Sequence, residues 1–109
     1  MDQRFEEMVE ALAGVRGFKA IVAAYRAGKD GRSFGSNGLK VEGRIFAMGV
    51  RGNLVVKLPK ARVAALVEAG HGEAFDPGHG RKMKEWVVIE GDQPSWLELA
   101  REAYAFVKG

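Results

Sequence analysis

Apolar residues in the first 28 positions recur at the three- and four-residue spacing of amphipathic helices. Two groups share this spacing: Phe5, Met8, Val9 and Leu12, then Phe18, Ile21, Val22 and Tyr25. At about 100° per residue the two stripes point in different directions, so one straight helix cannot present both to one core. Gly14 and Gly17 lie between them. We predict two helices, at about residues 2–13 and 17–27, closed by Gly28; a single bent helix is the alternative.

Beyond residue 28 the pattern changes to the two-residue alternation of β-strands. Residues 34–41, 44–50 and 54–58 are predicted to form three short strands, joined by tight turns into an antiparallel meander. The two faces of the second strand are expected to carry Phe46, Met48 and Val50 on one side and Ile45 and Ala47 on the other. Since neither face is clearly polar, the sheet is expected to need cover on both sides.

A helix, two strands and a last helix are predicted in the remaining residues. Pro59 suits a helix start and Gly70 a stop, so residues 59–69 form the helix, with Val63, Leu66 and Val67 as its apolar stripe. Short strands follow near residues 73–75 and 84–90. Asp92 and Pro94 then open the last helix, whose apolar stripe comprises Trp96, Ala100, Ala103 and Val107.

The order of elements is therefore helices, three strands, helix, two strands, helix. It predicts an α+β fold of two layers built on an antiparallel sheet, in a single domain covering residues 1–109. Four residues from different elements are predicted to be buried: Phe46, Leu66, Trp86 and Val107. Trp96 is expected in the core or in an interface.

Composition agrees with one globular domain. The chain has 109 residues, of which 47% are hydrophobic and 28% charged, and it has no cysteine, which excludes disulfides and thiolate chemistry. Acidic residues between positions 2 and 10 argue against a secretory leader, and no apolar run reaches the roughly 20 residues of a membrane helix. We expect a cytoplasmic protein without membrane contact.

Several segments resemble the N-terminal domain of the TfoX/Sxy family, in particular its small stand-alone bacterial members. They are Phe34–Val41 (FGSNGLKV), Gly43–Met48 (GRIFAM), Leu54–Pro59 (LVVKLP), Phe75–Gly78 (FDPG) and Met83–Val88 (MKEWVV). The resemblance implies a fold similar to the secretion-chaperone-like and YjbR-like proteins. It also implies a non-enzymatic domain without cofactor, acting through protein contacts as an accessory factor linked to transcription.

One stretch of the chain is unevenly basic, within a net charge of +3. No acidic residue lies between Glu42 and Glu68, and cations gather there and shortly after: Arg44, Arg51, Lys57, Lys60, Arg62, Arg81, Lys82 and Lys84. Cations on a common face bind phosphates, so weak nucleic-acid binding is the alternative function. The other interpretation is a solvated basic face, because no helix-turn-helix or aromatic RNA-binding signature accompanies these residues.

A second alternative is a small metal-binding or enzymatic site around His71 and His79. Together with Glu73 and Asp76 they place two imidazoles and two carboxylates within nine residues. Their spacing matches no established metal motif, and no nucleophile occupies a strained turn, so the sequence favours a non-enzymatic protein with these side chains in a solvated loop.

Self-association is the last expectation. If the helices cover one face of the sheet fully and the other only in part, apolar surface stays exposed, and a two-fold dimer would bury it. The helix at about residues 17–27 is the competing cover for that second face.

Overall fold

A computed structural model describes residues 3–28, 38–76, 83–91 and 95–109 of the chain. The helices are α1 (Gln3–Ala13), α2 (Lys19–Gly28), α3 (Lys60–Glu68) and α4 (Trp96–Lys108). The strands are β1 (Gly38–Val41), β2 (Arg44–Val50), β3 (Asn53–Lys57), β4 (Gly72–Phe75) and β5 (Met83–Ile89). The α+β fold and the predicted order of elements are confirmed.

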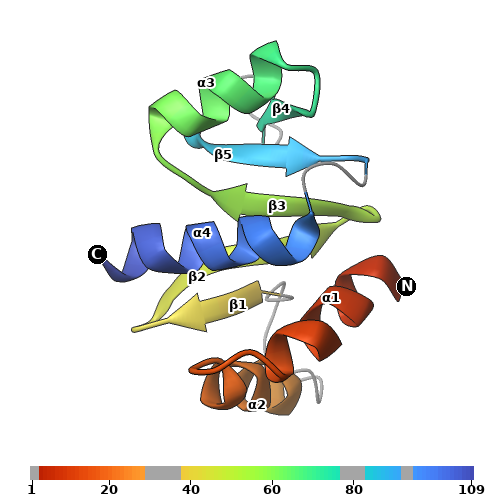
Figure 1. The fold of residues 1–109 in the computed structure, drawn as a ribbon, viewed down its shortest axis with the longest axis vertical. Helices are drawn as coiled ribbons and strands as arrows, with labels where there is room; N and C mark the ends of the chain where they lie inside the picture. Colours follow the sequence, from red (N-terminus) through yellow and green to blue (C-terminus); the bar gives the residue numbers. More distant parts are fainter. Residues whose placement is uncertain (1–2, 29–37, 77–82, 92–94) are drawn as a thin grey trace.

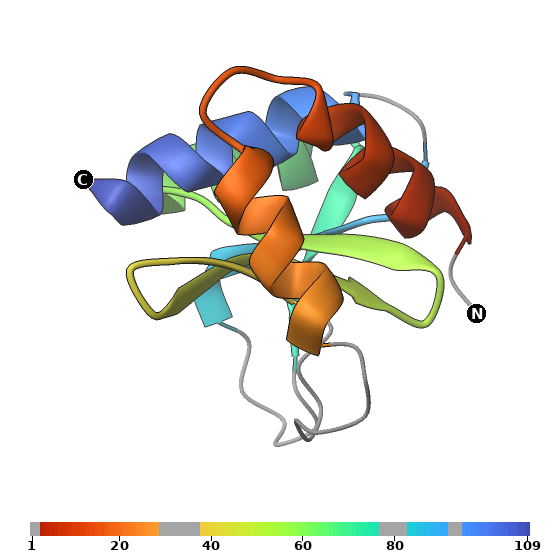
Figure 2. The same cartoon turned by 90° about the horizontal axis from the view of Figure 1, so that it is seen from below.

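The strands form one antiparallel sheet in the order β1-β2-β3-β5-β4. Helix α4 lies across β1, β2 and β3, while α3 packs on β5 and β4 at the other end of the sheet (Figure 1). Helix α1 packs beside α4, and α2 packs against α1 and β1 (Figure 2). The core therefore forms between the sheet and the layer of α1, α3 and α4, while α2 crosses the β1 edge (Figure 2). Strand β4 is the edge farthest from α2.

The break between the first two helices occurs where the sequence places it. Gly17 adopts a positive φ of 92°, which favours glycine, and α2 begins two residues later. The ring of Phe18 lies 4.6 Å from that of Tyr104 in α4, and Tyr25 packs edge-on against Phe5 at 5.9 Å. Both stripes thus enter the same core. The suggested role of α2 as cover for the second face of the sheet is wrong.

Two tight hairpins connect β1, β2 and β3. Val41 pairs with Arg44 and Val50 pairs with Asn53, so each connection has only two residues. Both residues of each turn have a positive φ, in Glu42 and Gly43 and again in Arg51 and Gly52. This geometry matches the right-handed twist of the flanking strands and confirms the predicted meander.

A β-bulge in β2 corrects the predicted facing of its side chains. Leu39 pairs with Ala47 and Lys40 with Ile45, which leaves Phe46 as the extra residue. Phe46 and Ala47 are both fully buried in the core, and the Phe46 ring lies 5.6 Å from that of Tyr104. Met48 therefore lies on the opposite face from Phe46, because the inserted residue reverses the alternation.

The second face of the sheet is also less open than expected. Met48 on β2 pairs with Val55, and Val55 pairs with Val88 on β5; Met48 and Val88 are half-buried and Val55 is fully buried. Trp86 lies on this face and is half-buried, so its predicted place in the core is wrong. Phe46, Leu66 and Val107 are buried as predicted.

Helices α1, α2 and α3 begin and end within two residues of the predicted positions. Pro59 is the N-cap of α3, and Gly70, with a φ of 82°, follows its last turn. Ser95 caps α4 by accepting a hydrogen bond from the Glu98 amide at 3.3 Å. The predicted starters of α4, Asp92 and Pro94, lie outside the described residues, as does the predicted start of the first strand at Phe34.

Gly72, the first residue of β4, allows the closest backbone approach in the described sheet. A Cβ atom at this position would lie 2.3 Å from the Val88 carbonyl oxygen, far inside contact distance. We expect Gly72→Ala to lower the free energy of unfolding by about 1–3 kcal/mol, because backbone must move to admit the methyl group. Gly91→Ala is the control, since a Cβ there has open space, and it should stay within about 0.5 kcal/mol. Urea unfolding measures both; equal effects would contradict the close approach.

Candidate functional site

Most of the described cations of the basic stretch lie at one end of the sheet, and Arg51 lies at the other end. Arg51 lies in the β2–β3 turn and Lys57 at the other end of β3, so the two are about 20 Å apart along the strand. Lys57 has its ammonium 5.9 Å from the Trp86 ring centroid. Arg44 begins β2, 3.9 Å from a Glu42 carboxylate oxygen. Lys60 and Lys84 lie near Lys57 and Arg44, because the start of β2, the end of β3 and the start of β5 meet at this end of the sheet. Arg81 and Lys82 lie outside the described residues.

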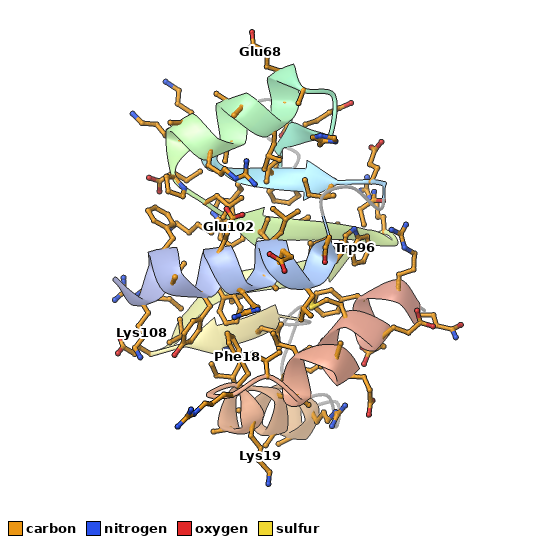
Figure 3. All side chains as sticks on the ribbon, viewed as in Figure 1. Phe18, Lys19, Glu68, Trp96, Glu102 and Lys108 are labelled. Carbon is orange, nitrogen blue, oxygen red and sulfur yellow. The ribbon has the colours of Figure 1, made fainter. Side chains whose placement is uncertain are left out.

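Arg62 is neutralised by a partner distant in sequence. Its Nε and Nη2 atoms donate hydrogen bonds of 3.0 and 3.1 Å to the two carboxylate oxygens of Glu102. This bidentate ion pair joins α3 to α4, and Figure 3 shows Glu102 on the side of α4 that faces α3. Arg62 therefore has a structural partner and does not present a free charge to a phosphate.

A concave surface lies between α3 and the edge of the sheet. This groove has a volume of about 640 Å³. It is lined by Lys60, Val63, Ala64, Val67, Glu68, Ala74 and Lys84. Five of these residues form one stripe of α3, Ala74 belongs to β4 and Lys84 to β5. We call it the α3–β4 groove.

The apolar floor of the α3–β4 groove contains the one large apolar side chain that is exposed among the described residues. Val67 is 40% exposed, whereas Val63 and Leu66 are buried. The predicted placement of Val67 with them on the core stripe is therefore wrong. Ala64 is exposed beside it and Ala74 lies below. The groove thus offers an apolar contact surface rather than a set of reactive groups.

Charged residues stand at the two ends of the groove. Lys60 is the first residue of α3, and Lys84 lies near it because the Leu58 amide donates a 2.9 Å hydrogen bond to the Glu85 carbonyl. Glu68 is the last residue of α3, at the end of the molecule labelled in Figure 3. No ion pair joins Lys60, Lys84 or Glu68 to another described residue. The groove is positive at one end and negative at the other.

Beside the groove, β4 is an edge strand in the described sheet, with β5 as its only neighbour. Its outer backbone groups therefore have no strand partner among the described residues. Such an edge is a template for pairing with another chain. The sequence did not predict this site, because the order of strands in the sheet is not visible in it. The pattern that could have indicated the groove is the second stripe of α3, from Lys60 through Ala64 and Val67.

The predicted metal cluster is only partly described. His71 is half-buried before β4, Glu73 and Asp76 are exposed in and after it, and His79 lies outside the described residues. Across the part of the chain that the structure describes, no three or more histidine, aspartate or glutamate side chains are grouped to hold a metal ion.

Comparison with protein-family models, with curated proteins and with solved structures found no match. No helix within the described ranges is long and apolar enough to cross a membrane.

A zinc titration tests the metal alternative. We expect excess Zn²⁺ to leave the melting temperature of the chain unchanged, because a protein is stabilised only by a ligand that its folded state binds. Thermal unfolding with and without zinc measures this. Stoichiometric zinc retained by the untagged protein, and lost in the His71→Ala, His79→Ala double variant, would contradict the expectation.

Proposed function

We propose that this chain is a non-enzymatic, TfoX-like binding domain that works in the cytoplasm through protein contacts at the α3–β4 groove, as an accessory factor linked to transcription. The observation that carries the proposal is the combination of an apolar groove with β4, which is an edge strand in the described part of the sheet. Val67 and Ala64 supply apolar contact area, and β4 supplies backbone donors and acceptors that have no strand partner within the described ranges. A protein segment satisfies both requirements at once.

The arrangement of elements also supports the TfoX-like part of the proposal. Helices, three strands, a helix, two strands and a helix follow one another in the order that the resemblance implies. The motifs behind the resemblance consist largely of turn glycines and strand residues, which serve the fold. We therefore assign the proposed activity to the surface of the α3–β4 groove and not to the motif residues.

Nucleic-acid binding has less support than protein binding. A phosphate backbone requires several cations on a common face. Arg62 is paired with Glu102, and Arg51 lies at the opposite end of β3 from Lys57. Four cations gather at one end of the sheet: Arg44, Lys57, Lys60 and Lys84. Arg44, however, lies 3.9 Å from a Glu42 carboxylate oxygen, and Lys60 and Lys84 border an apolar floor.

Site-specific photo-crosslinking in the source cell tests the proposal. A photoreactive residue replaces Val67 in the groove, and in the control it replaces Lys19, which is exposed on α2 at the opposite end of the molecule (Figure 3). We expect protein adducts from position 67 and none of the same size from position 19. Their identification by mass spectrometry names the partner.

Three results would overturn the proposal: no adduct from position 67, the same protein adducts from both positions, or adducts with nucleic acid alone. In the last case the basic residues near the groove would become the leading explanation.

A further inference from the structure

The outer side of β4 has no strand partner among the residues that the structure describes. Helix α3 contacts both β4 and β5, so it covers the last two strands at this end of the sheet (Figure 1). Its inward residues Val63 and Leu66 are buried. The next stripe, with Ala64 and Val67, borders the groove. A strand added to β4 would lie about 4.8 Å farther out, beneath that stripe.

The charges at the ends of α3 oppose the helix dipole. Lys60 stands at the N-terminus, where an acidic residue is favoured, and Glu68 stands at the C-terminus, where a basic residue is favoured. Neither charge is compensated by an ion pair with another described residue. Both therefore cost local stability, and an opposite charge arriving from outside would offset this cost.

A second copy of the chain supplies those opposite charges. When two copies are related by a two-fold axis, the positive end of one groove faces the negative end of the other. The ends of α3 are about 12 Å apart, so one axis near the middle of the helix forms both contacts at once. An unrelated partner would need a matching charge pattern, whereas a second copy has it by symmetry.

The dimensions of the fold fit this arrangement. If the two β4 strands pair antiparallel, the two α3 helices are separated by about two strand spacings, or about 10 Å. This is the distance at which helices pack with side chains in contact. An axis at Ala74 keeps both sets of helices on one face and places Glu73 opposite Phe75 rather than opposite a second Glu73.

We infer that the α3–β4 groove binds a second copy of this chain: the β4 strands pair into one continuous sheet, the α3 helices lie antiparallel, and Lys60 of each copy contacts Glu68 of the other. Val67 becomes buried at the centre. The inference rests on the proposed function, because it names the partner for the same surface. It also moves the expected dimer contact from the second face of the sheet to its edge.

Sedimentation of the full chain with exchanged charges tests the inference. The wild type should shift from 11.9 kDa toward twice that mass as its concentration rises through the micromolar range. Lys60→Glu and Glu68→Lys should each weaken the dimer about tenfold, because each variant places like charges together at two symmetric contacts. The double variant should regain the wild-type affinity, since the exchanged charges attract again. Lys19→Glu is the control for the same change of charge, and it should leave the dimer unchanged.

The melting temperature of the dilute monomer shows whether a variant weakens the dimer or damages the fold. Both single substitutions bring the charges of α3 into line with the helix dipole, so the melting temperature of the dilute monomer should rise or stay constant while the dimer weakens. A monomer at every concentration, single variants that dimerise like the wild type, or a double variant no better than the singles would each overturn the inference. If the wild type is monomeric but position 67 crosslinks to a different protein, the proposed function stands and only the second copy is excluded.

Discussion

The rest of the structure depends on how α4 covers the sheet. This helix lies across β1, β2 and β3, and its Tyr104 ring contacts both Phe46 from the sheet and Phe18, which directly precedes α2. Since α4 occupies the first three strands, the shorter α3 is left to cover β5 and β4. A nine-residue helix over β5 and the edge strand β4 covers them with one stripe and turns the next stripe outward. The α3–β4 groove follows from this division of the sheet between two helices.

Much of the fold could be predicted from the sequence, because local signals determine it. The glycines around the first helix break, the two-residue turns after Val41 and Val50, and Pro59 before α3 all act within a few residues of their position. Such signals fix where elements begin and end. They do not determine which side of an element meets the core when both sides are apolar.

The errors in facing have this cause. The bulge at Phe46 inserts one residue into β2, and no alternation pattern reveals where an insertion lies. Trp86 and Val87 are neighbours with apolar character on opposite faces, and only the position of the helices makes Val87 the buried one. Val67 borders the core stripe of α3, but the sheet ends beneath it. The site was missed for a similar reason, since the partner of Arg62 is 40 residues away and the free edge depends on strand order.

Amide hydrogen exchange as a function of protein concentration tests most directly whether the edge at β4 pairs with a second copy. The amides of β3 already lie between two strands. Their exchange rates should therefore not depend on protein concentration, as long as exchange does not require global unfolding. The outward-facing amides of β4 should exchange quickly in dilute solution and become protected as the dimer forms. Exchange of the β4 amides that stays the same from the lowest to the highest concentration would contradict the pairing.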